Sequence, residues 1–224
     1  MLVRIKRVIE RERNKLPGTS ASVLILNRLI QIVKEKAERF YIVLRKDSTF
    51  TSKKDLFMCS LFPEKVLDIV TTEVKPLSVL DVGCGIGLSL QYYLSKGIDA
   101  VGIENSNIAI SQSGVKEKIV KYNLNKELNL NRIFDLVWCF EVIEHIHPDY
   151  ETAFLKTLTN HSSNILISAA KPGQGGHGHF NEQLPGYWIS KFKQLGYQYD
   201  ERFTEKLKAT NETHCENLLF FKRV

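Results

Sequence analysis

Short apolar runs alternate with amphipathic segments from residue 63 to the end of the chain. Such runs, bounded by polar residues or glycine, predict buried strands, and apolar residues at helical spacing between them predict helices. Alternating strands and helices are typical of a parallel sheet that is covered on both faces. The predicted strands are Ser78–Val82, Ala100–Glu104, Ile119–Tyr122, Phe134–Phe140, Asn164–Ser168, Tyr197–Tyr199 and Leu218–Lys222, and the predicted helices are Pro63–Thr72, Leu88–Lys96, Ser106–Gln112, Asp149–Asn160 and Tyr187–Leu195.

The residues before this alternation predict a helical extension. Apolar residues recur at helical spacing in Leu2–Arg13, and Leu16-Pro17-Gly18 ends that segment. A second predicted helix begins after N-cap candidates at positions 19–22 and runs to about Tyr41. We therefore divide the chain into an N-terminal extension, residues 1–62, and a main domain, residues 63–224.

Positive charge is concentrated in the extension. Up to Ser60 there are fourteen Lys and Arg residues against six acidic residues, whereas the whole chain has a net charge of +6. A basic segment is suited to an anionic partner such as nucleic acid, a phosphorylated sugar or a membrane surface. The simpler interpretation, which we favour, is a solvated helical face whose apolar side packs against the main domain.

Composition limits the class of protein. A chain of 224 residues with 43% hydrophobic residues can bury one sizeable core, so one main domain is expected. No apolar run approaches the roughly 18 residues that span a bilayer, and the charged N-terminus lacks the apolar stretch of a signal peptide. These features predict a cytoplasmic protein without a membrane span. Reduced thiols, with neither disulfides nor zinc, are expected because no C-x-x-C pair occurs among Cys59, Cys84, Cys139 and Cys215.

An apolar strand that breaks into closely spaced glycines is the strongest candidate for a ligand site. In the run Val79–Gly87, the glycines at positions 83, 85 and 87 remove Cβ where the chain bends and where a ligand approaches the backbone. The helix predicted after them turns its N-terminus toward that ligand. The dinucleotide fingerprint G-x-G-x-x-G requires a third glycine at position 88, which is Leu88 in this chain. The pattern therefore points away from NAD.

With Asp81 two residues before the first glycine, the run V-L-D-V-G-C-G-I-G resembles motif I of the class I S-adenosylmethionine-dependent methyltransferases. In that family the next strand ends in an acid that accepts the ribose hydroxyls, and Glu104 occupies this place. The resemblance implies an α/β fold with a Rossmann-like, seven-stranded, mostly parallel sheet, helices on both faces and an antiparallel last strand. It also implies S-adenosylmethionine as cofactor, bound by Asp81, Gly83, Cys84, Gly85, Gly87, Glu104, Asn123 and Glu141.

Two of these implied contacts follow later strands. Asn123 stands where the family often has an aspartate that accepts from the adenine amino group, and an amide oxygen can accept the same bond without a charge. Glu141 begins the run E-V-I-E-H after the fourth strand. The family places this motif beneath the methionine part of the cofactor and beside the substrate.

The E-V-I-E-H run allows three interpretations. It is common among small-molecule O-methyltransferases, and it also occurs in small-RNA 3′-terminal 2′-O-methyltransferases of the HEN1 type, where two glutamates and two histidines bind a divalent cation. By that resemblance Glu141, Glu144 and His145, with His177 or His179, would hold Mg²⁺ or Mn²⁺. Without a metal, His145 or a loop histidine is an acid–base candidate, because imidazole titrates near physiological pH. In the third interpretation these residues only cap a helix and fix a loop.

The glycine-rich segment Lys171–Gln183 follows the fifth strand, where the lid of the substrate pocket forms in this fold. Its glycines predict a mobile loop that closes over the acceptor. Together with Tyr187 and Trp188, the segment resembles a branch of bacterial and viral methyltransferases whose acceptors are often sugars or other small polar molecules. An ordinary surface loop is the alternative interpretation.

We therefore expect an S-adenosylmethionine-dependent methyltransferase that methylates an oxygen of a small polar or sugar-like acceptor. The catalytic candidates are His145 and His179, which would position or deprotonate that acceptor. One alternative is a metal-dependent RNA ribose 2′-O-methyltransferase of the HEN1 type, with nucleic acid as a partner of the basic extension. The other is a non-catalytic, cofactor-binding subunit that recruits a partner through that extension.

Overall fold

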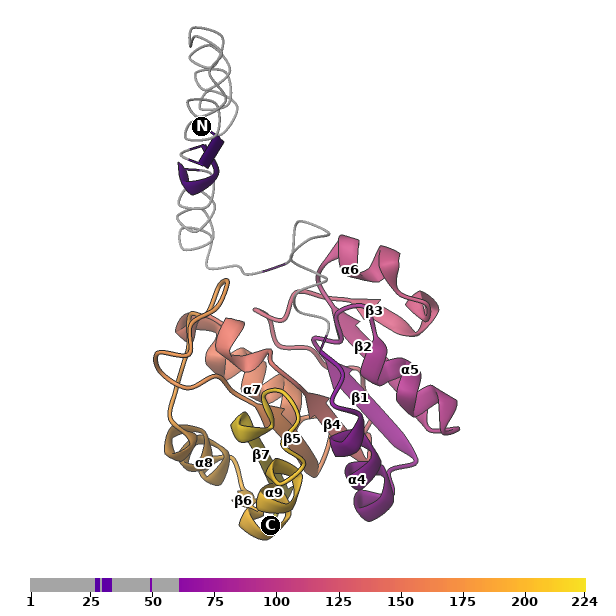
Figure 1. Ribbon diagram of the computed structural model, residues 1–224. Coiled ribbons are helices and arrows are strands. Elements are labelled where there is room, and N and C mark those ends of the chain that lie inside the picture. The colour runs from indigo at the N-terminus through magenta and orange to yellow at the C-terminus, as the bar shows by residue number, and fades with distance from the viewer. Residues whose placement is uncertain (1–26, 29, 34–48, 50–60) are drawn as a thin grey trace, which may run out of the picture. The chain divides into compact units, whose positions relative to one another are not determined.

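The computed structural model describes residues 27–28, 30–33, 49 and 61–224 (Figure 1). Residues 27–28 and 30–33 are helical, within the second helix predicted for the extension. The remainder of that extension, including the predicted helix Leu2–Arg13 and Cys59, lies outside the described residues. The division of the chain at residue 62 therefore stays a prediction.

Seven strands of the described region form one sheet in the order β3-β2-β1-β4-β5-β7-β6. Neighbouring strands are parallel, except that β7 runs antiparallel to both β5 and β6. The predicted Rossmann-like sheet with a reversed last strand is thus confirmed. The strands are β1 (Ser78–Val82), β2 (Asp99–Glu104), β3 (Ile119–Lys121), β4 (Leu136–Cys139), β5 (Asn164–Ser168), β6 (Tyr197–Tyr199) and β7 (Leu218–Arg223).

Two apolar clusters lie on the two faces of this sheet. Successive residues of β1 divide between them, because side chains alternate along a strand: Val79 belongs to one cluster and Leu80 to the other. Helices α7 (Glu151–Thr159) and α8 (Pro185–Gln194) contribute to the Leu80 cluster. Helices α4 (Glu64–Val74), α5 (Leu88–Ser95) and α9 (Glu201–Lys208) contribute to the Val79 cluster. Both faces are therefore covered, as predicted (Figure 1).

The remaining helical elements are short. They are the α-helix α6 (Asn107–Gln112) and the 3-10 helices η1 (Lys116–Lys118), η2 (Ile143–His145), η3 (Pro148–Tyr150) and η4 (Cys215–Asn217). No helix among the described residues has the length and apolar character to span a bilayer. Of the cysteines in the described part of the chain, Cys84, Cys139 and Cys215 are free.

One helix was not predicted. Helix α9 is mostly charged, and only Phe203 and Leu207, four residues apart, reach the core from it. Its start is marked by Asp200, whose side chain accepts a hydrogen bond from the Phe203 amide at 3.0 Å. The N-cap residue was the feature of the sequence from which this helix could have been predicted. Two apolar residues alone are too few to form a periodic pattern.

The strands and helices predicted for residues 63–224 lie within two residues of the observed ones. The fourth strand shows how such a difference at its ends arises. Phe134 makes only an isolated bridge with Ser162, so the ladder of β4 begins at Leu136. Beyond Cys139, the backbone of Glu141 enters the left-handed region with φ 54°. This turn ends the strand and starts the segment that carries Glu144 and His145.

The parallel strands β1, β2, β4 and β5 end at the same edge of the sheet. At this edge lie the glycine turn after β1, the segment after Glu104, the E-V-I-E-H run after β4 and the long connection from β5 to α8 (Figure 1). Ligands of open α/β sheets bind outside these strand ends. The candidate site residues predicted from sequence are therefore on the same side of the molecule.

Candidate functional site

The carboxylate of Glu104 fixes the ends of β1 and β2 relative to each other. Its Oε2 accepts a hydrogen bond from the Gly85 amide at 2.9 Å, and its Oε1 accepts from the amides of Asn105 and Ser106, both at 2.7 Å. Burial raises the pKa of Glu104, and these amide bonds oppose that rise. In the same turn, the amides of Gly83 and residue 84 both donate to the carbonyl of residue 103, at 2.8 Å and 3.0 Å.

The turn itself requires glycine. Gly83, Gly85 and Gly87 have φ values of 77°, 56° and 80°, a region that residues with a Cβ rarely adopt. A Cβ on Gly83 would lie 2.5 Å from Cγ2 of Val142, whereas a Cβ on Gly85 would meet nothing within 4 Å. The turn after β1 is therefore packed directly against the segment after β4.

Cys84 contributes its backbone to the turn, while its side chain lies against the sheet. A Cβ on Gly102 of β2 would be 2.6 Å from the Cys84 Sγ, so the sulfur fills the space that this glycine leaves. Burial raises the pKa of the Cys84 thiol well above its usual value, with the charges of Asp81 and Glu104 adding to the effect. Its thiol is therefore neutral near pH 7.

Asp81, near the end of β1, is a buried acid with an unused oxygen. The residue is 3% exposed, and its Oδ2 has no hydrogen-bond partner within the described part of the chain. Burial, followed by the charge of Glu104, raises the pKa of Asp81 to about 8, although a backbone hydrogen bond from Leu90 acts in the opposite direction. Without a cation beside it, this carboxyl group holds its proton near pH 7.

Asn123 lies after β3 at the same edge of the sheet. Its Oδ1 accepts a hydrogen bond from the Asn125 amide at 2.9 Å, which closes a local turn. The half-buried side chain is thus oriented by its own segment. A carbonyl oxygen has two lone pairs, so Oδ1 can accept a second donor.

Glu141 and Ser168 join the ends of β4 and β5. The Glu141 amide donates to the Ser168 Oγ at 2.6 Å, and that hydroxyl donates to Oε1 of Glu141 at 2.7 Å. Ser168 was not among the predicted site residues, although its place as the last residue of a parallel strand was a usable signal. The hydrogen bonds hold Glu141 in its left-handed backbone conformation.

Glu144 is a second carboxyl group on this segment, and it is fully buried. Neither of its oxygens has a hydrogen-bond partner among the described residues. Burial, followed by the negative charge of Glu141, raises the pKa of Glu144 well above its usual value. Two neighbouring carboxyl groups in a buried site cannot both be charged unless a cation lies beside them, so Glu144 is neutral or has a cationic partner.

The loop between β5 and α8 is docked onto η2. The carbonyl of Glu144 accepts hydrogen bonds from the amides of Phe180 and Asn181, at 2.9 Å and 3.0 Å. The carbonyl of Gly178 lies 3.3 Å from Nδ1 of His145. These contacts bring His179 beside His145, with a distance of 4.8 Å between the ring centroids.

Glu182 organises the same loop internally. Its carboxylate accepts from the amides of Gly173 and Gly175, at 2.8 Å and 2.7 Å, and contacts Nδ1 of His179 at 2.9 Å. A carboxylate on Nδ1 holds the proton there and makes Nε2 of His179 the accepting nitrogen. Glu182 was not among the residues predicted for the site.

Three of the predicted metal or acid–base residues come together. Among the described residues, one carboxylate oxygen of Glu144 and one ring nitrogen each of His145 and His179 lie within 4.8 Å of one another. His177 and Glu141 are outside this group. Burial, followed by the charge of His179, lowers the pKa of His145 to about 4, so His145 is neutral near pH 7.

His214 and Asn217 reach Glu141 from the connection between α9 and β7. Nδ1 of His214 lies 3.5 Å from Oε2 of Glu141, and Nδ2 of Asn217 donates to Oε1 at 3.4 Å. Both residues also contact Gln174 of the loop between β5 and α8. The sequence offered no signal for this approach, because Asn217 is separated from Glu141 by 76 positions.

The family model described as "Methyltransferase domain" matches residues 53–216, more than two thirds of the chain. The ubiquinone biosynthesis O-methyltransferase of Rickettsia canadensis is 33% identical over 107 residues, which cover 44% of this chain and 44% of that protein. The corresponding protein of Rickettsia conorii is 31% identical over 129 residues, covering 54% of this chain and 42% of that protein. The matches therefore span less than half the length of these curated relatives.

Solved structures show the same fold. The sugar N-methyltransferase KedS8 from Streptoalloteichus has a TM-score of 0.61 and 15% identity, and the match covers 78% of this chain and 94% of that one. The methyltransferase domain of bacterial CtHen1-C has a TM-score of 0.54 and 18% identity, with 72% of this chain and 96% of that one covered. At these identities the likeness concerns the fold alone.

The packing of the glycine turn predicts different costs for two substitutions. Gly83→Ala and Gly85→Ala each place a Cβ at positive φ, which costs roughly 1–2 kcal/mol. Gly83→Ala also overlaps Val142, which adds roughly 1–3 kcal/mol. Urea unfolding should therefore show a larger loss of stability for Gly83→Ala. In the double variant Gly83→Ala/Val142→Ala part of that loss should be recovered, and equal losses at the two glycines would contradict the packing.

Asp81 predicts a pH-dependent difference in stability. Its pKa in the folded protein is above the unfolded value, so its contribution is fully present below about pH 4 and is lost as the pH rises toward 8. Asp81→Asn mimics the protonated form. The unfolding free energy of Asp81→Asn minus that of the wild type should increase between pH 5 and pH 8, by up to about 1.4 kcal/mol per pH unit. A difference that does not change with pH would show that Asp81 is already charged.

Proposed function

The chain belongs to the methyltransferase domain family, and we propose that it transfers the methyl group of S-adenosylmethionine to an oxygen of a small polar or sugar-like acceptor. One observation carries the cofactor part of this proposal. Two buried acids, Asp81 and Glu104, stand at adjacent strand ends beside a glycine turn whose backbone is fixed by Glu104. The curated relatives, which are O-methyltransferases by name, support an oxygen as the accepting atom.

Glu104 is suited to the ribose of the cofactor. A carboxylate has about four acceptor sites, and three backbone amides occupy Glu104 in this structure. It can therefore accept a further bond from a hydroxyl group. Asn123 follows β3, and its Oδ1 accepts one backbone hydrogen bond. The second lone pair of this oxygen can accept a hydrogen bond from the adenine amino group of the cofactor.

Asp81 is suited to the charge of the cofactor. A buried carboxyl group with an unpartnered oxygen gains from a cation nearby, because the cation compensates for its poor solvation. The methionine part of S-adenosylmethionine carries an ammonium and a sulfonium group. The backbone of Gly83, Gly85 and Gly87, which has no Cβ, would let that part approach the turn.

When bound, S-adenosylmethionine supplies a methyl group on a sulfonium that an acceptor oxygen attacks directly. The oxygen–carbon bond forms as the sulfur–carbon bond breaks, the electron pair of that bond stays on sulfur, and the proton of the acceptor hydroxyl goes to a base. The protein has to align the acceptor, exclude water and accept that proton. A protein nucleophile is not required.

His179 is the better candidate for the base. Glu182 on its Nδ1 leaves Nε2 to accept a proton and stabilises the imidazolium that results. The low pKa of His145 makes that residue a weak base near pH 7, so we assign it a positioning role beside His179. A docked loop is necessary for this arrangement, because His179 belongs to the loop and His145 does not.

A second candidate function follows from the cluster of Glu144, His145 and His179. A buried carboxylate with two unpartnered oxygens beside two imidazoles fits a divalent cation, and Glu182 on His179 resembles the carboxylates that orient metal-bound histidines. Mn²⁺ and Mg²⁺ accept carboxylate ligands readily. Such an ion would hold adjacent hydroxyls of an acceptor such as a ribose end of RNA. Glu141 and His177 are outside the group, and this weakens the four-ligand interpretation.

Cofactor binding is tested at Glu104. Titration calorimetry should show S-adenosylmethionine binding to the wild type, and Glu104→Gln should weaken it at least tenfold, because the charge and one acceptor oxygen are lost. Asp99→Asn is the matched control on the same strand, since Asp99 is exposed at the opposite end of β2. Absence of binding to the wild type would contradict the cofactor, and an unchanged affinity of Glu104→Gln would contradict the role of Glu104.

The metal question is tested at Glu144. If this residue is protonated, Glu144→Gln is a neutral substitute of the same shape, and we expect turnover within about threefold of the wild type and no effect of EDTA. If Glu144 holds a cation, the same variant should lose turnover and Mn²⁺ binding together, and EDTA should abolish the activity of the wild type. Mn²⁺ binding is measured by the loss of the free-ion electron paramagnetic resonance signal.

A further inference from the structure

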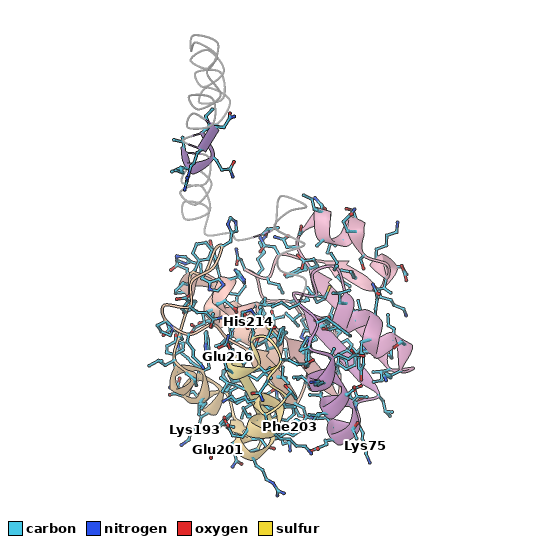
Figure 2. The ribbon with its side chains drawn as sticks, in the orientation of Figure 1. Lys75, Lys193, Glu201, Phe203, His214 and Glu216 are labelled. Carbon is cyan, nitrogen blue, oxygen red and sulfur yellow. The ribbon has the colours of Figure 1, made fainter. Side chains whose placement is uncertain are left out.

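The connection between α9 and β7 brings two residues outside the sequence motifs, His214 and Asn217, to Glu141 of the E-V-I-E-H run. The polar cluster that results consists of Glu141 after β4, Gln174 in the loop after β5, and His214 and Asn217 around η4. Figure 2 shows Lys193 and Glu201 at the lower end of the domain, with His214 above them. His214 is thus on the side where the loops after the parallel strands gather.

The hydrogen bonds of this cluster leave an acceptor unused. Asn217 is 3% exposed, and its Nδ2 donates to Gln174 Oε1 at 3.1 Å and to Glu141 Oε1 at 3.4 Å. Its Oδ1 has no partner among the described residues, although it is buried. A buried carbonyl oxygen without a donor costs free energy, so the cluster lacks a donor.

Nδ1 of His214 has two neighbours in the cluster. Oε1 of Gln174 accepts from Asn217 and from the amide of Lys171, the latter at 3.3 Å, and this places its Nε2 toward the histidine. Nδ1 of His214 lies 3.2 Å from that amide nitrogen and 3.5 Å from Oε2 of Glu141. A ligand can therefore contact this ring at Nε2, which donates or accepts according to the tautomer.

The backbone supports a functional explanation of the cluster. Glu141 and His214 have φ values of 54° and 64°, in the left-handed region that residues with side chains rarely adopt. Such conformations persist where the surrounding structure imposes them and are concentrated at binding sites. Here the two strained residues bring a carboxylate oxygen and an imidazole nitrogen within 3.5 Å of each other.

We propose that Glu141, His214 and Asn217 form a subsite for a hydroxyl group of the acceptor, a second hydroxyl besides the one that is methylated. The inference rests on the proposed function and narrows the acceptor to polyhydroxylated molecules such as glycosides. A hydroxyl group carries both a donor and an acceptor, so it can donate to Asn217 Oδ1, which lacks a donor within the described part of the chain, and it can pair with a ring nitrogen of His214 in either tautomer.

The reacting hydroxyl and the subsite are separate but adjacent. The proposed base, His179, belongs to the cluster with Glu144 and His145, whereas Glu141 belongs to the subsite. Glu141 and Glu144 are three positions apart, and the charge of Glu141 acts on Glu144. Both groups of residues thus include a glutamate of the segment after β4, and the proposal requires one acceptor to contact both.

The test measures glycoside binding separately from cofactor binding. Wild-type protein saturated with S-adenosylhomocysteine is mixed with a panel of methyl glycosides, and their affinities are measured by saturation-transfer NMR. At least one glycoside should bind, and His214→Asn and Asn217→Leu should weaken it at least tenfold. The affinity for S-adenosylhomocysteine, measured by calorimetry, should stay within twofold. Asn is chosen at position 214 because it tolerates positive φ.

Two further variants guard against a purely structural explanation. Gln174 is exposed, so Gln174→Ala should fold normally and still weaken the glycoside about threefold, because His214 and Asn217 lose a side chain that orients them. Glu216→Gln is the control from the same 3-10 helix, because the side chain of Glu216 is exposed. It should bind the glycoside like the wild type.

The outcomes separate this inference from the proposed function. If S-adenosylhomocysteine does not bind the wild type, the proposed function fails and the subsite fails with it. If S-adenosylhomocysteine binds but no methyl glycoside does, or if the His214 and Asn217 variants bind the glycoside like the wild type, only the subsite is overturned. Equal weakening of glycoside and S-adenosylhomocysteine would show a structural role and would also overturn it.

Discussion

The hydrogen bonds from three backbone amides to the carboxylate of Glu104 are the interaction on which the rest of the site depends. They fix the position of the turn after β1 relative to the end of β2. Because that turn is in contact with Val142, its position also determines where the segment after β4 lies. Glu141 and Glu144 flank Val142 in this segment, so the two halves of the site are connected through one packed contact.

Buried carboxyl groups lie on both sides of that contact, and all of them have raised pKa values. Burial is the largest cause of the raised pKa of Asp81, Glu104 and Glu144. Each of them is stabilised by a proton or by a cation. A sulfonium group between the two halves would therefore be favoured by its surroundings, and after methyl transfer the uncharged thioether product would lose that stabilisation.

Local signals in the sequence were sufficient for the strands and for finding the glycine turn, Asp81 and Glu104 at neighbouring strand ends. The bounds of β1, β5 and β6 agree with the predicted ones because each is an apolar or aromatic run that ends at a glycine or polar residue. The acceptor side was only partly predictable. His145 and His179 were identified, but Glu182, Ser168 and Asn217 were not, since their roles depend on contacts between segments that a single sequence does not bring together.

The two parts of the acceptor side depend on one loop. Glu182 folds the loop by accepting from Gly173, Gly175 and His179, and the amide of Asn181 anchors it to Glu144. The same loop carries Gln174, which contacts His214 and Asn217. A movement of the loop away from η2 would therefore remove the proposed base from His145 and the Gln174 amide from His214 together. The proposed proton acceptance and hydroxyl recognition would both require the docked loop, which would also exclude water from the acceptor.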